Sequence, residues 1–119
     1  MLENADQPAP AAPVSPEKWG LYAYYNNLGL ALMGLDRVDE AIAAYQKAIA
    51  LYPKSSEARN NYGNALYPKG QFYQAIEELH QALSLDPKNA DAWLNLGNTL
   101  GKKNQYTQAV AAYSQALVS

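Results

Sequence analysis

Apolar side chains recur three and four residues apart through residues 22–119, which is the spacing of one face of an α-helix. Each of three successive units has a stripe built around a glycine, made by Tyr25, Leu28, Gly29 and Leu32, by Arg59, Tyr62, Gly63 and Leu66, and by Trp93, Leu96, Gly97 and Leu100. A second segment of each unit alternates alanines with one large residue, at Ala41, Tyr45 and Ala48, at Ala75, Leu79 and Ala82, and at Ala109, Tyr113 and Ala116. Because small residues opposite large ones let two helices approach closely, the pattern predicts one helical hairpin in each unit.

The two stripes return every 34 residues, so one unit is written three times. A period of this length predicts an all-α fold in which each unit buries its apolar face against the next. We expect one domain over residues 16–119, with repeats at 22–55, 56–89 and 90–119. Ser15 is a suitable N-cap and Pro16 a suitable first helical residue, whereas the Ala- and Pro-rich residues 1–15 are predicted to form a disordered tail.

The third unit carries Trp93-x2-Leu96-Gly97-x2-Leu100 followed by Ala109, Tyr113 and Ala116, and Pro87 closes the unit before it. This set resembles the tetratricopeptide repeat (TPR), and the match covers residues 22–119. The resemblance implies a right-handed α-solenoid of three helix-turn-helix hairpins. It also implies a concave groove, lined by the first helix of each unit, that holds a peptide of a partner protein.

Three positions depart from the repeat pattern. Arg59 stands where an aromatic residue is expected, and we expect its stem to cover apolar surface while its guanidinium reaches solvent or an acid such as Glu57 or Glu78. Pro68 is expected to end the first helix of unit two early. Asp36 occupies the usual glycine position of the turn, so we expect local adjustment there.

Helical angles place a set of mostly polar residues opposite the packing stripes, and these are the predicted peptide-binding residues. They are Asn26, Asn27, Leu30, Asn60, Asn61, Asn64, Tyr67, Leu94, Asn95 and Asn98. An amide offers both a donor and an acceptor, so a column of them can pair with successive peptide groups of a bound strand. The column of Asn27, Asn61 and Asn95 resembles the asparagine ladder of O-GlcNAc transferases. The alternative is that these amides only bind a neighbouring helix, and for Tyr67 the alternative is simple packing at a turn.

Composition and the lack of known motifs argue against several classes of function. Nine Lys and Arg against eleven Asp and Glu give a net charge of −2, which leaves no basic field for nucleic acid. The chain has no cysteine and a single histidine, His80, which we interpret as a surface residue. No motif of a nucleophile, phosphate loop or metal site is present, so we expect no enzyme activity, no cofactor and no metal. No apolar run is long enough to span a membrane. Cytoplasm is the default location, although an export signal could have been removed.

Two further hypotheses stay open. The last unit should present a bare stripe of Val110, Tyr113 and Leu117, through which copies of the chain could self-associate head to tail or tail to tail. The chain could also be the substrate-recruiting domain of a larger enzyme. A groove that captures a carboxylate is disfavoured, because Asn, Asp and Leu occupy the positions where Lys and Arg would be needed.

Overall fold

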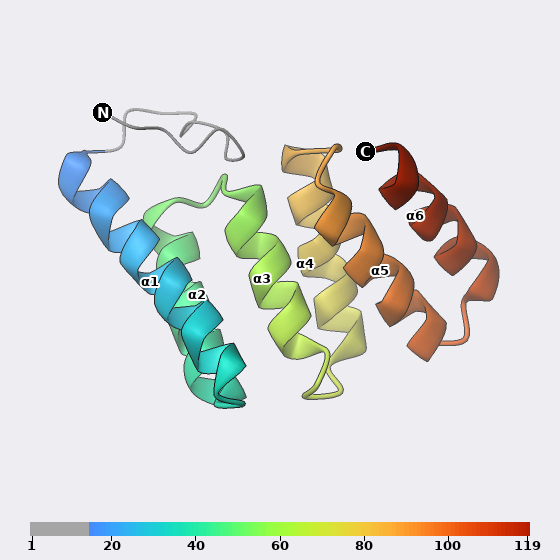
Figure 1. Ribbon diagram of the computed structural model, residues 1–119, viewed down its shortest axis with the longest axis horizontal. Coiled ribbons are helices and arrows are strands. Elements are labelled where there is room, and N and C mark those ends of the chain that lie inside the picture. Colours follow the sequence, from blue (N-terminus) through green and yellow to red (C-terminus); the bar gives the residue numbers. More distant parts are fainter. Residues whose placement is uncertain (1–14) are drawn as a thin grey trace.

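Three helical hairpins stack side by side along the chain (Figure 1). The computed structural model describes residues 15–119, so the predicted tail lies outside the described residues except for Ser15. The hairpins are formed by α1 (Pro16–Gly34) with α2 (Val38–Leu51), α3 (Ser56–Leu66) with α4 (Phe72–Leu85), and α5 (Ala90–Lys102) with α6 (Tyr106–Val118). Helix α3 packs on α2, and α5 packs on α4, so each unit covers the one before it. The predicted all-α solenoid of three hairpins is confirmed.

Side-chain caps determine where the first helices begin. Ser15 accepts a hydrogen bond from the Lys18 amide at 3.1 Å, and Pro16 follows as the first residue of α1, as predicted. The same cap recurs at Ser55, before α3, and at Asn89, before α5. The predicted early stop is also confirmed, because α3 ends at Leu66, two residues before Pro68.

Within each hairpin, the glycine of the first helix lies against the large residue of the second. A Cβ atom on Gly63 would lie 2.9 Å from Cγ of Leu79, and one on Gly97 would lie 2.6 Å from Cε1 of Tyr113. Gly29 faces the Tyr45 ring in the same way. The small-against-large pattern therefore describes a real close approach of two helix backbones.

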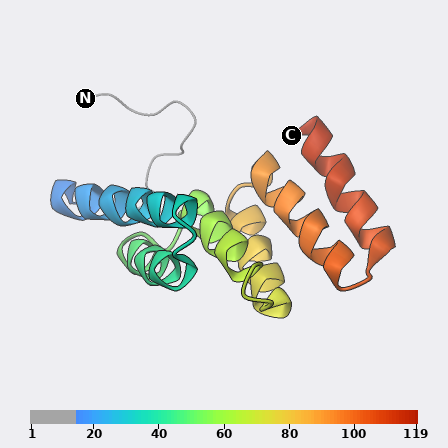
Figure 2. The ribbon, with the colours of Figure 1, turned by 60° about the horizontal axis from the view of Figure 1, so that its bottom comes forward.

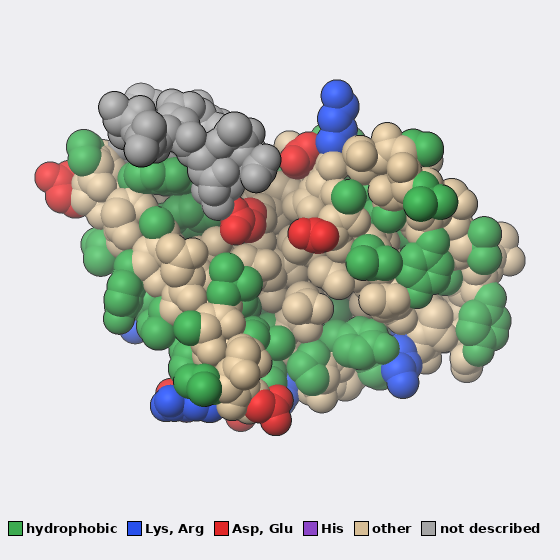
Figure 3. Space-filling view, in the orientation of Figure 1, with side chains coloured by type: hydrophobic (Ala, Val, Ile, Leu, Met, Phe, Trp, Pro, Cys, Tyr) green, Lys and Arg blue, Asp and Glu red, His purple; other side chains and the backbone are tan. Residues whose placement is uncertain are grey.

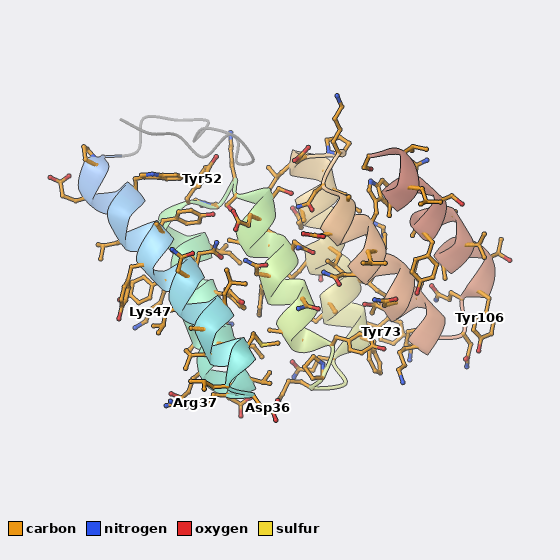
Figure 4. All side chains as sticks on the ribbon, in the orientation of Figure 1. Asp36, Arg37, Lys47, Tyr52, Tyr73 and Tyr106 are labelled. Atoms are coloured by element: carbon orange, nitrogen blue, oxygen red, sulfur yellow. The ribbon has the colours of Figure 1, made fainter. Side chains whose placement is uncertain are left out.

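The turns of the three hairpins share one backbone conformation. Asp36, Gly70 and Asn104 stand 34 residues apart and have φ angles of 62°, 73° and 63°, in the left-handed region. Aspartate and asparagine tolerate this region better than other residues with a side chain. The turn at Asp36, at the lower end of the first hairpin in Figure 4, thus keeps the glycine conformation without the glycine.

Arg59 makes a hydrogen bond equivalent to the one that the aromatic residue at the same position of unit three makes. In unit three the indole N–H of Trp93 donates to the Pro87 carbonyl at 2.8 Å, and in unit two Nε of Arg59 donates to the Pro53 carbonyl at 3.3 Å. Its Nη1 also reaches Oε1 of Glu78 at 3.0 Å. The prediction that the guanidinium would pair with a nearby acid is confirmed.

Candidate peptide-binding and docking surfaces

Helices α1, α3 and α5 are consecutive neighbours and share one side of the array (Figures 1 and 2). We call this side the first-helix face. Asn27, Asn64 and Asn98 are exposed on it, whereas Asn61 and Asn95 are half-buried. Leu30 and Leu94 are each 46% exposed. Tyr67 is half-buried as well, so eight of the ten predicted peptide-binding residues are exposed or half-buried.

Two pairs of asparagines join neighbouring units. Nδ2 of Asn61 donates to Oδ1 of Asn26 at 3.0 Å, and Nδ2 of Asn95 donates to Oδ1 of Asn60 at 2.9 Å. We call these two side-chain bonds the amide rungs. The side chains of Asn26 and Asn60 are buried between neighbouring first helices, with residue exposures of 2% and 6%. The prediction that these two line an open groove is wrong, because the stacking of the units covers them.

A second bond joins the same units near the start of the first helices. The hydroxyls of Tyr22 and Ser55 lie 2.6 Å apart, so the N-cap of α3 is also tied to α1. At the next interface, Nδ2 of Asn89 donates to Oγ of Ser56 at 2.9 Å. Sequence reasoning missed these contacts, although the 34-residue spacing of the two N-caps, Ser55 and Asn89, was a visible signal.

Burial also changes the acidity of two tyrosines in this region. Loss of hydration raises the pKa of Tyr22 to about 12, the bond to Ser55 opposes that rise, and the negative charge of Glu57 adds to it. Burial and Glu57 together raise the pKa of Tyr45 to about 12. The neutral forms of both side chains are therefore part of the folded interface.

Some side chains of the first-helix face are already engaged within their own unit. The Tyr67 ring meets Phe72 edge-on with 5.5 Å between centroids, which is the turn-packing alternative for that residue. Oδ1 of Asn98 accepts a hydrogen bond from the Tyr113 hydroxyl. Figure 3 shows acidic side chains on the upper part of this view. Glu57 and Asp91 lie at equivalent positions in the first turns of α3 and α5. The face therefore combines amides, leucines and carboxylates.

The outer side of the third hairpin is apolar and uncovered. Val110, Tyr113 and Leu117 are 65%, 38% and 88% exposed, as the pattern predicted, and whether copies associate through them stays a prediction. Helix α6 contains no charged residue, and the exposed ring of Tyr106 marks its start at the outer edge of the molecule (Figure 4). We call the surface formed by Leu94, Tyr113 and Leu117 the terminal face.

Residues 15–119 offer neither a metal-binding cluster nor a membrane-spanning helix. This range holds no group of three or more His, Cys, Asp or Glu side chains placed to bind a metal ion. None of its helices combines the length and the apolarity that a membrane crossing requires.

The comparisons with known proteins agree with this geometry. Family models described as tetratricopeptide repeat match residues 22–55, 44–77 and 91–118, and one described as TPR repeat matches residues 63–104. No curated protein matches the chain by sequence.

Several solved structures share the fold. MamA is 29% identical with a TM-score of 0.75, and the match covers 81% of this chain but only 56% of MamA. The TPR domain of Arabidopsis OM64 is 25% identical with a TM-score of 0.83, over 85% of this chain and 84% of that one. The second TPR of Spaghetti (RPAP3), bound to the HSP90 peptide SRMEEVD, has a TM-score of 0.80 over 87% of this chain and 98% of its own. Since it is only 16% identical, that likeness concerns the fold.

Proposed function

Because the chain belongs to the tetratricopeptide repeat family, which serves protein–protein interaction, we propose that it is a non-catalytic module that holds an extended peptide of a partner on its first-helix face. The observation that carries the proposal is the exposure of Asn64 and Asn98 at equivalent positions of α3 and α5. Each amide can donate to a peptide carbonyl and accept from a peptide N–H, so main-chain recognition needs no particular side chain. For Asn98 this uses the second lone pair of Oδ1, because the first accepts from the Tyr113 hydroxyl.

The half-buried amides extend this surface. Asn61 and Asn95 each use one N–H group in a rung, which leaves a second N–H group on each side chain for a ligand. Leu30 and Leu94 supply apolar contact area beside the amides. Asn26, Asn60 and Tyr67 act as supports of the face rather than as ligand contacts.

The charges of the face limit the ligand. Glu57 and Asp91 lie on α3 and α5, and like charges are repelled when they are brought together on a partly desolvated surface. An acidic peptide such as the one bound to the RPAP3 domain is therefore a poor candidate for this chain. A neutral or basic segment suits the face better.

A selection from a random linear-peptide library, followed by fluorescence anisotropy on an enriched peptide, tests the proposal. The double variant Asn64→Ala/Asn98→Ala leaves both rungs intact and is expected to weaken binding about tenfold, because two hydrogen bonds contribute roughly 0.5–1.5 kcal/mol each. Gln81→Ala removes an exposed amide from α4, outside the first-helix face, and is the matched control. Equal affinity of the double variant and the parent chain would place the site elsewhere.

A further inference from the structure

The terminal face is the third copy of a surface that is covered twice inside the molecule. Leu79 and Leu83 of unit two are 0% and 7% exposed in the cluster that they form with α5, whereas their equivalents Tyr113 and Leu117 are 38% and 88% exposed. One position differs in chemistry as well as in exposure. Where Asn26 and Asn60 accept the rungs, unit three has Leu94.

The internal interfaces also define what kind of helix covers such a surface. Both covering helices, α3 and α5, present a small residue, a large apolar residue four positions later and a second small residue seven positions later. These residues are Ala58, Tyr62 and Ala65 on α3 and Ala92, Leu96 and Thr99 on α5. Each of the six is almost fully buried. The residue three positions after the first small one, Asn61 or Asn95, donates the rung.

The chain's own first helix does not fit this description. Tyr24 stands at the position of Ala58 and Ala92, and it is 57% exposed. If a second copy placed α1 on the terminal face in the internal register, the Tyr24 ring would stand where both internal interfaces hold a fully buried alanine, and such overpacking is unfavourable. The Asn27 amide would at the same time face Leu94, and a buried donor that loses its acceptor is unfavourable as well.

We propose that the terminal face binds a helix of a partner protein, and that Tyr24 and Leu94 prevent copies of the chain from stacking on it head to tail. The partner helix has small residues at positions i and i+7 and a large apolar residue at i+4. Its residue at i+3 is apolar, because Leu94 replaces the amide acceptor of the internal interfaces. The terminal face shares Leu94 with the first-helix face, but Tyr113 and Leu117 lie on α6, outside that face. The proposal concerns a partner helix rather than an extended peptide, so it does not depend on peptide binding.

Rebuilding α1 to this pattern turns a second copy of the chain into the probe. The double variant Tyr24→Ala/Asn27→Leu changes two exposed side chains and presents the small, apolar, large, small series with Leu28 and Ala31. Sedimentation velocity over a hundredfold concentration range is expected to show a constant monomer mass for the parent chain. The double variant should at least double its average mass at the highest concentration, and adding Leu117→Asp should restore the monomer.

Circular dichroism serves as the control: each variant should keep its helices, so that a change in mass reports association. A parent chain that itself associates, in either orientation, would overturn the proposal by making a second copy the occupant. A folded double variant that stays monomeric would overturn it too, because the terminal face would then reject the helix that it is proposed to bind. Association that survives Leu117→Asp would place the contact on another surface and would also contradict the proposal.

Discussion

Replacing each of three glycines by alanine distinguishes the effect of close helix packing on stability from the effect of helix propensity. Replacing glycine by alanine in a helix contributes about 1 kcal/mol of stability when the new methyl group is unobstructed. Gly20 of α1 has no atom within 4 Å of such a methyl group, so Gly20→Ala should raise the free energy of unfolding by about 0.5–1 kcal/mol. Gly29 faces the Tyr45 ring, which is only 1% exposed and has no room to move. Overpacking of about 2–3 kcal/mol then outweighs the propensity gain, and Gly29→Ala should destabilise the chain by about 1–2 kcal/mol.

Gly97 tests whether the neighbouring ring can yield. Its methyl group would lie 2.6 Å from the Tyr113 ring, where ordinary contacts begin at 3.4 Å, but Tyr113 is 38% exposed and can turn toward solvent. Gly97→Ala should therefore stay within about 1 kcal/mol of the parent chain. Urea denaturation followed by circular dichroism measures all three variants with a common slope. A loss for Gly97→Ala as large as that for Gly29→Ala would refute the reasoning, because exposure of the ring would then make no difference.

Three other predictions follow from the unit interfaces. Raising the pH from 10 to about 12 should lower the free energy of unfolding, because folding raises the pKa of Tyr22 and Tyr45. The stability that these two neutral side chains contribute is complete below pH 10 and is lost as the pH rises through 12. Tyrosinate absorbance and circular dichroism recorded together would show the loss. Asn60→Ala should lower the free energy of unfolding by about 1–3 kcal/mol, since the Asn95 amide loses its acceptor, while Asn64→Ala should change it by less than about 0.5 kcal/mol; equal effects in urea denaturation would contradict the rung. Ser55→Ala removes the N-cap of α3 together with the Tyr22 contact and should lower the free energy of unfolding by about 1–2 kcal/mol. Ser15→Ala, at the exposed cap of α1, should lower it by less. Thermal melts of the two variants provide the comparison.

Much of the fold is predictable because its signals are local. The glycine facing a large residue, the cap at Ser15 and the stop before Pro68 each depend on neighbours within a few turns of the chain. Repetition strengthened these signals, since a spacing that occurs by chance once does not recur in three registers.

The direction of the asparagines was harder to predict, because it depends on how one unit rotates against the next. A helical wheel places Asn26 and Asn60 opposite the packing stripe of their own hairpin, and the wheel of a single helix contains no information about the neighbouring unit that covers them. The useful signal was the doubling itself. In Asn26-Asn27 and Asn60-Asn61 the first amide points to the following unit, while Asn61 points to the preceding one. Unit three has Leu94-Asn95, which keeps only the backward-pointing amide.

Helix α3 is the element through which the two ends of the array depend on each other. Asn61 and the N-cap Ser55 bond to α1, whereas their chain neighbours Asn60 and Ser56 bond to α5 and to its N-cap Asn89. In a nearest-neighbour description of a repeat array, an outer hairpin that opens breaks one interface, but the middle hairpin must break two. Local opening should therefore begin at the two end hairpins and reach α3 last.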